Sequence, residues 1–372
     1  MVALLGVATL LATGSASLRA ANLPAITAQL AAINTLDAKL AFLKQATGLS
    51  EKEKAALGAS VIESVAPADQ KAAAVKVALT LSAGGANTAR FATLLVNALP
   101  SQLGASLAGS IAIGAGQADP AHLPQIAAAV IVANSATIAN SAAIAGEVTA
   151  AAPLSITGEI ASAIGSTFAQ HHNLAQKAPE IAASMTSAIV TKGTLDQVRP
   201  QVANTVAALT ALLPGSVSDN KALIVRIGKA VAAVIAPKYP GLATTVVGVT
   251  SAALKAAAGT VDIGPVLTSF SDTFRDAIND PAIQAKLAAV VSDVNQGGGG
   301  KDITPLEKQI SDNRASDLPP VGVVAPKTAS YPGAPGAPAD PGSFFFWTPP
   351  ATPTPTPTPE SGPIVPPVTT VQ

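Results

Sequence analysis

A long and nearly uncharged stretch in the middle of the chain limits the folds that this sequence can adopt. Residues 91–176 contain three acidic residues, Asp119, Glu147 and Glu159, and no lysine or arginine. Three interpretations are open from the sequence. The stretch is the centre of the fold, or it carries an association surface, or it faces lipid or glycan.

The sequence of the uncharged stretch does not predict a transmembrane helix. Residues 91–118 and 120–146 carry no charge and are long enough to cross a bilayer. However, prolines or glycine clusters interrupt both, and Ser, Thr, Asn and Gln are frequent in them. The longest purely apolar run is 126–133, which is too short to cross. We therefore expect no transmembrane span in the mature chain. Lipid contact is not favoured, because interfacial helices usually carry basic residues.

Composition excludes several classes of protein. The 22 basic and 22 acidic residues give a net charge of zero, so no surplus positive charge is available to bind nucleic acid. The chain has no cysteine, which excludes disulfides and thiolate metal sites. Hydrophobic residues make up 49% of the chain and 80 residues are alanine, which argues against a wholly disordered protein. An alanine-rich, mostly helical protein with a large apolar core is the expected result.

Prolines and glycines divide the chain into a body and a tail. Of the 30 prolines, 17 lie after residue 294, and four consecutive glycines at 297–300 form a flexible joint. The body is predicted to be all-α, an irregular array of short alanine-rich helices packed as a helical-hairpin solenoid or bundle. About a dozen helices are expected in it. The predicted segments are a signal peptide at 1–20, the helical domain at 21–296, and a disordered Gly/Pro/Thr-rich tail at 297–372 with one short helix near 305–313.

Local patterns predict helix faces and helix starts. Apolar residues at helical spacing predict buried stripes, which are Phe91, Leu94, Leu95, Ala98 and Leu99; Leu267, Phe270, Phe274 and Ile278; and Ile283, Leu287, Val290, Val291 and Val294. Caps are predicted at Ser50 with Glu53, Thr194 with Gln197, Thr304 with Glu307, and Asp280 before Pro281. A proline followed two residues later by an aliphatic residue is predicted to mark a first helical turn at Pro24, Pro124, Pro179, Pro200, Pro240 and Pro265. Their spacing is irregular and assigns no named repeat family.

The first 20 residues resemble an export signal. Residues 2–12 are mostly apolar but too short to span a bilayer, and small residues follow them. Cleavage after Ala16 or Ala20 fits this pattern, although no basic residue precedes the apolar run. An ordinary first helix is the alternative interpretation. We expect an exported protein of the periplasm, cell envelope or extracellular space.

The sequence offers no catalytic, cofactor-binding or metal-binding residues. Its three histidines are His122 and the adjacent pair His171 and His172, which point about 100° apart on a helix and cannot chelate one ion together. Residues 218–221 (SDNK) match two β-lactamase motifs, but the motifs overlap and no K-T-G follows. Ser218 or Asp219 is instead predicted to cap a helix. No phosphate-binding or dinucleotide-binding motif is present.

The tail contains one feature that predicts binding. Residues 297–372 hold five of the eleven aromatic residues. Four of these are consecutive: Phe344, Phe345, Phe346 and Trp347. Exposed aromatic rings are costly in water, which favours folding back onto the helical body or docking on a partner. A loose tail without function is the third interpretation. We assign these four residues as a candidate partner-docking site, within a proline- and threonine-rich segment that cannot form a core.

These observations lead to two functional hypotheses. The first is an exported, non-enzymatic helical protein that acts as a structural or protein-interaction module of the bacterial cell envelope, by self-association or with a protein partner. The alternative is an envelope carrier that encloses a lipid or small ligand in an apolar helical cavity. No cofactor is expected in either case.

Overall fold

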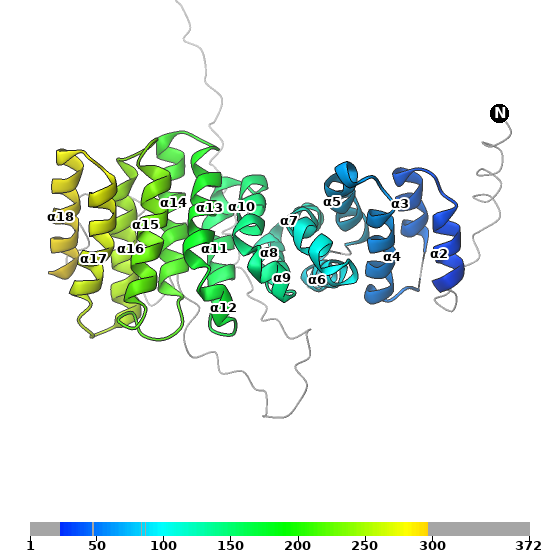
Figure 1. The fold of residues 1–372 in the computed structure, drawn as a ribbon, viewed down its shortest axis with the longest axis horizontal. Coiled ribbons are helices and arrows are strands. Elements are labelled where there is room, and N and C mark those ends of the chain that lie inside the picture. Colours follow the sequence, from blue (N-terminus) through cyan, green and yellow to red (C-terminus); the bar gives the residue numbers. More distant parts are fainter. Residues whose placement is uncertain (1–22, 47, 83, 86, 297–372) are drawn as a thin grey trace, which may run out of the picture. The chain divides into compact units, whose positions relative to one another are not determined.

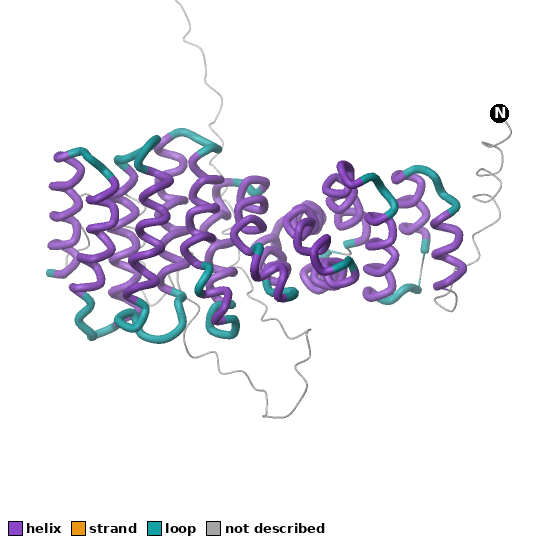
Figure 2. Tube along the Cα trace, viewed as in Figure 1, coloured by secondary structure: helices purple, strands orange, loops and turns teal. Residues whose placement is uncertain are grey.

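The computed structural model describes residues 23–296, except residues 47, 83 and 86. This part of the chain contains seventeen α-helices, α2 to α18, with three short 3-10 helices and no strand (Figures 1 and 2). The all-α prediction is confirmed, although the helices are more numerous than expected. The predicted signal peptide, the tail, the short helix near 305–313 and the cap at Thr304 lie outside the described residues.

The helices form two layers, in which each helix packs against the preceding and following helix of its own layer. Layer A contains α3 (Leu36–Gln45), α5 (Gln70–Leu81), α7 (Ser101–Ala118), α10 (Ser141–Ala151), α13 (Ala178–Val190), α15 (Lys221–Ile235) and α17 (Gly264–Ala277). Layer B contains α2 (Leu23–Ala31), α4 (Glu51–Glu63), α6 (Asn87–Ala98), α8 (Leu123–Ile131), α11 (Thr157–Ser166), α14 (Leu195–Ala211), α16 (Leu242–Ala258) and α18 (Pro281–Asn295).

Short helices occupy several of the connections. They are α9 (Ser135–Ala139), α12 (His172–Ala175) and the 3-10 turns η2 (Pro67–Asp69), η3 (Pro120–His122) and η4 (Leu154–Ile156). Because the chain alternates between the layers, successive helices form hairpins that stack into an irregular helical array. The hairpins starting at residues 178, 221 and 264 repeat every 43 residues, whereas the preceding one begins at residue 141, only 37 residues earlier.

The predicted caps and stripes are largely found in the described helices. The Ser50 backbone N–H donates to Glu53 Oε2 (2.8 Å) at the start of α4. Asp280 Oδ1 accepts from the backbone N–H of Ala282 (2.9 Å) at the start of α18. Among the predicted stripe residues, Leu94 and Ile283 are half-buried, and Ala98 is exposed because α6 ends there. The remaining stripe residues are buried.

The proline prediction holds at four of the six sites and is wrong at Pro240 and Pro200. Prolines occupy the second position of α2, α8, α13 and α17. Pro240 lies two residues before α16. Pro200 is not in a first turn but inside α14. That helix already begins at Leu195, where the backbone N–H of Thr194 donates to Gln197 Oε1 (3.1 Å). The N-terminal cap therefore sets the start of α14, and the helix tolerates one missing N–H donor at Pro200.

Lysines connect neighbouring helices by donating to backbone carbonyls at helix ends. Lys192, after α13, donates to the Thr149 carbonyl (2.7 Å) and to the Ala152 carbonyl at the end of α10. Lys238, after α15, donates to the Val190 carbonyl (2.9 Å) at the end of α13. The last carbonyls of a helix have no partner within the helix and carry partial negative charge. Each lysine therefore joins its hairpin to the preceding one.

Glycines let α7 approach its neighbours closely. A Cβ at Gly104 would lie 2.5 Å from the Val96 carbonyl oxygen of α6. A Cβ at Gly114 would overlap the Val75 backbone of α5, with the Val75 Cα at 2.9 Å. Backbone cannot move aside as a flexible side chain can. The separation of α7 from both helices therefore depends on glycine.

Gly114→Ala tests this dependence. We expect it to lower the free energy of unfolding by about 1–3 kcal/mol, because the added methyl group meets backbone. Gly248→Ala in α16 is the matched control, since its Cβ would lie 3.5 Å from Val290 Cγ1, an ordinary contact. The control should gain about 0.5–1 kcal/mol from helix propensity. Urea unfolding of the full chain measures both, and equal effects would contradict the argument.

Candidate functional site

The nearly uncharged segment begins in the interior of the described helical body. In α7, 11 of 18 residues are buried, and the helix packs against α5, α6, α8 and α10. In α8, every residue from Ile126 to Ile131 is buried. A charge at such positions would lose its hydration. The interpretation of this segment as the centre of the fold is therefore confirmed for α7 and α8.

The lipid-facing interpretation gains no support from the described surface. Its exposed large hydrophobic side chains are Leu79 and Val261, and both lie outside residues 91–176. None of the described helices has the length and apolar character needed to span a bilayer. The exposed side chains within the uncharged segment are mainly small or neutral polar ones.

The three acidic residues of this segment differ in their surroundings. Asp119 follows α7 and is buried. The Glu147 Oε1 atom pairs with Lys71 Nζ at 2.6 Å, which links α10 to α5. A Cβ at Gly109 would overlap the Glu147 side chain, so the carboxylate passes over α7 where that helix has no side chain. Burial raises the pKa of Glu159. Two of the three charges therefore serve helix packing.

Asp119 forms a polar cluster that the sequence analysis missed. Its carboxylate oxygens each lie 2.9 Å from His122 Nδ1, and Oδ2 accepts from the Thr88 hydroxyl at 3.4 Å. The carboxylate stands between the hydroxyl and the imidazole. In a nucleophilic triad the imidazole must stand between them to take the hydroxyl proton. The cluster therefore ties α6 to the turn between α7 and α8 and lacks the catalytic order of groups.

The other sequence candidates are not brought together into a site. His171 precedes α12 and His172 begins it. The described residues contain no group of three or more His, Cys, Asp or Glu side chains able to hold a metal ion. The prediction that Ser218 or Asp219 caps a helix is wrong, because α15 begins at Lys221 after Asn220. The Asp219 N–H donates instead to Ser216 Oγ at 3.1 Å within the preceding turn.

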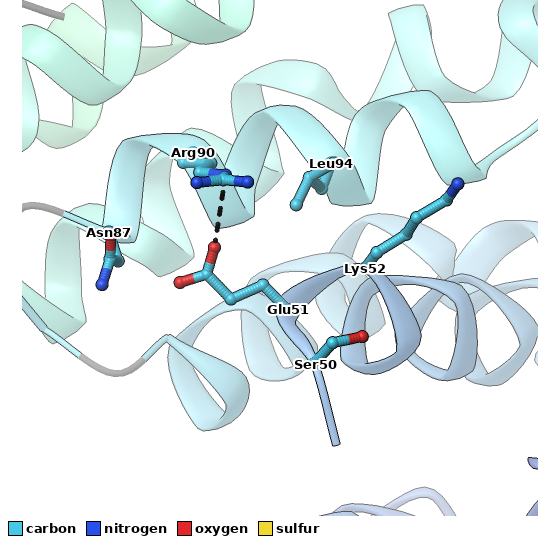
Figure 3. A pocket seen from close by; sticks show the side chains of 6 residues that line it. All are labelled: Ser50, Glu51, Lys52, Asn87, Arg90 and Leu94. Atoms are coloured by element: carbon cyan, nitrogen blue, oxygen red, sulfur yellow. Dashed lines mark ion pairs between the residues drawn. The ribbon is translucent and has the colours of Figure 1, made fainter. Parts of the chain in front are cut away.

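A shallow hollow of about 370 Å³ lies between the beginnings of α4 and α6 (Figure 3). Its lining residues are Ser50, Glu51, Lys52, Asn87, Arg90 and Leu94. Arg90 Nε lies 3.5 Å from Glu51 Oε2, so the cation and the carboxylate that face each other across the hollow already form a pair. The Ser50 hydroxyl already donates to Glu53 Oε2 and accepts from the Glu53 N–H in the N-terminal cap of α4. Five of the six lining residues are polar or charged, so the hollow does not resemble the wall of an apolar carrier cavity.

Comparison of the chain with protein families, with curated proteins and with solved structures finds no match. The predicted docking residues, Phe344 to Trp347, lie outside the described residues.

Of the contacts that were not predicted from the sequence, only one could have been recognised from residue spacing. Asp119 and His122 are three residues apart beside a helix start, which brings the two side chains within reach of each other. The pair between Lys71 and Glu147 spans 76 residues and depends on layer packing, so local spacing could not reveal it. The hollow depends in the same way on how α4 and α6 pack.

Glu159 and Glu53 are expected to show opposite pH dependence. Burial raises the pKa of Glu159 above 4.5, so the folded chain holds this proton more tightly than the unfolded chain. Glu159 therefore lowers stability as the pH rises from 4.5 through its folded pKa. Hydrogen bonds from Ser50 lower the pKa of Glu53, so this carboxylate contributes stability that is lost as the pH falls below 4.5 through its folded pKa.

Urea titrations of Glu159→Gln and Glu53→Gln across this pH range measure the two effects. At neutral pH we expect Glu159→Gln to be more stable than the parent chain and Glu53→Gln to be less stable. The stability gain of Glu159→Gln should vanish below pH 4.5, where Glu159 is protonated in both the folded and the unfolded chain. The stability loss of Glu53→Gln should become smaller as the pH falls through the pKa of Glu53 in the folded chain. The same sign for both variants would contradict these assignments.

Proposed function

We propose that this protein is an exported, non-enzymatic helical protein that acts as a structural or protein-interaction module of the bacterial cell envelope. The observation that carries the proposal is the two-layer array of helical hairpins. Stacked hairpins present the sides of many helices as one extended surface, a form well suited to binding another chain. Fold alone does not assign function, so the proposal also uses the polar contacts.

Those polar contacts support a structural role for the ionisable side chains, which join helices to one another. Lys76 pairs with Asp37 (3.1 Å) across α5 and α3, and Arg226 pairs with Glu180 (3.9 Å) across α15 and α13. These two pairs join successive helices of layer A, and the pair between Lys71 and Glu147 joins α5 to α10 across α7. Exposed pairs contribute little stability individually. In these three pairs the charged groups serve contacts between helices.

Cross-linking mass spectrometry of the natively purified protein tests the proposal. We expect cross-links from lysines of the helical body to one specific protein, or to a second copy of the chain. Native mass spectrometry of the same sample covers the carrier alternative. A bound lipid or small molecule together with an absence of protein cross-links would overturn the proposal in favour of the carrier.

The aromatic residues of the tail provide a second test. We expect serine at positions 344–347 to remove the cross-linked partner and leave the melting temperature of the chain unchanged. The reason is that four apolar rings would lose the burial that a partner gives them. Serine at Phe270 is the matched control, since this ring is fully buried in α17 and its loss should lower the melting temperature. Unchanged partner binding in the tail variant would remove these residues from the docking site.

Export is tested at the N-terminus. We expect the protein recovered from the envelope or medium to begin at Ser17 or Ala21, as cleavage after Ala16 or Ala20 predicts. N-terminal sequencing of the purified protein measures this directly. A full-length N-terminus on protein confined to the cytoplasm would show that residues 2–12 are not an export signal.

A further inference from the structure

The helical array has an open end at its last described hairpin, formed by α17 and α18. In layer B, α14 over 198–211 and α16 over 242–255 have no exposed residue, and each packs against a helix of the same layer on both sides. Among the described helices, α18 packs in its own layer against α16 alone. Eight of its residues are exposed, and five of these are small and apolar. These five, here called the open side of α18, are Pro281, Ala282, Ala285, Ala288 and Ala289.

The open end is polar over α17. Gly228 on α15 faces α17, since a Cβ there would lie 2.9 Å from Phe270 Cδ2. Ala232, one turn further along the same side, is fully buried. One repeat of 43 residues later this position is Arg275, which is exposed and whose Nη2 atom lies 2.8 Å from Asp272 Oδ1. The apolar part of the open end therefore lies on α18 rather than on α17.

The repeat of the array predicts a further helix start in the sequence that follows α18. The layer-A helices α13, α15 and α17 begin at residues 178, 221 and 264, and a further step of 43 residues gives residue 307. The fourth residue of each helix is fully buried, and the same step from there gives Ile310. Those buried residues are Ile181, Ile224 and Leu267. Residues 305–313 are also the short helix that the cap at Thr304 and Glu307 predicts.

This predicted helix has an apolar side that suits the open side of α18. Leu306 and Ile310 are four residues apart and share one side of a helix, whereas Lys308, Ser311 and Asp312 lie on the opposite side. A polar outer side is what the last unit of a helical array needs. The residues between Asn295 and Thr304 can span about 30 Å when extended. That reach exceeds the length of α18, which is about 22 Å.

We propose that residues 304–313 form a closing helix that packs Leu306 and Ile310 on the open side of α18. A second copy of the chain is the other candidate occupant, but this side of the helix measures only about 200 Å². A stable interface between chains buries about 800 Å² on each partner. A tethered segment needs far less area, because its effective concentration at α18 is in the millimolar range. The inference needs no external partner and is therefore independent of the proposed function.

Hydrogen exchange of the full-length protein, followed by mass spectrometry, tests the inference. We expect the backbone amides of residues 305–313 to exchange at least about tenfold more slowly than those of a free peptide with the same sequence. Ile310→Ser should remove this difference, because the helix loses an apolar contact with α18. Lys308→Ser is the matched control. It changes the polar side of the same helix with no smaller loss of helix propensity, and it should keep the slow exchange.

A substitution on α18 shows where the segment packs. Ala285→Glu places a charge on the open side, and we expect it to abolish the slow exchange of residues 305–313. Ala143→Glu, at an exposed position of α10, is its control and should have no effect. Exchange as fast as in the free peptide, or slow exchange that Ala285→Glu leaves intact, would overturn the inference. Slow exchange that disappears on dilution of the protein would also overturn it, because the occupant would then be a second copy of the chain.

Discussion

The close approach of helices around α7 is the constraint on which the described fold depends. α7 packs against helices of both layers, and glycine at Gly104 and Gly114 allows it to lie against backbone. A helix enclosed in this way cannot carry solvated charge, and this explains why the sequence loses its charged residues there. The Glu147 side chain adapts to the same constraint, because it crosses α7 over Gly109 to reach Lys71.

Local sequence signals predicted helix starts better than they predicted how the helices are grouped. The cap at Ser50 and the cap at Asp280 with Pro281 depend on a few consecutive residues, and both are present. The prediction at Pro200 is wrong, because a proline pattern alone does not show that a cap at Thr194 has already started the helix. The hairpin repeat was hidden because its spacing changes from 37 to 43 residues along the chain.

The contacts around the candidate site could not be predicted from the sequence, because they join residues that are distant along the chain. Thr88 and Asp119 are 31 residues apart, and Lys71 and Glu147 are 76 apart. Such pairs form only after the layers have stacked.

The two layers are held together by different contacts. In layer A, ion pairs of Lys76 with Asp37 and of Arg226 with Glu180 join successive helices. Over α8 to α16 the described helices of layer B have no such pair between them, and buried apolar side chains join them. Exposed ion pairs contribute little stability individually, so the burial of apolar side chains is the larger stabilising term in both layers.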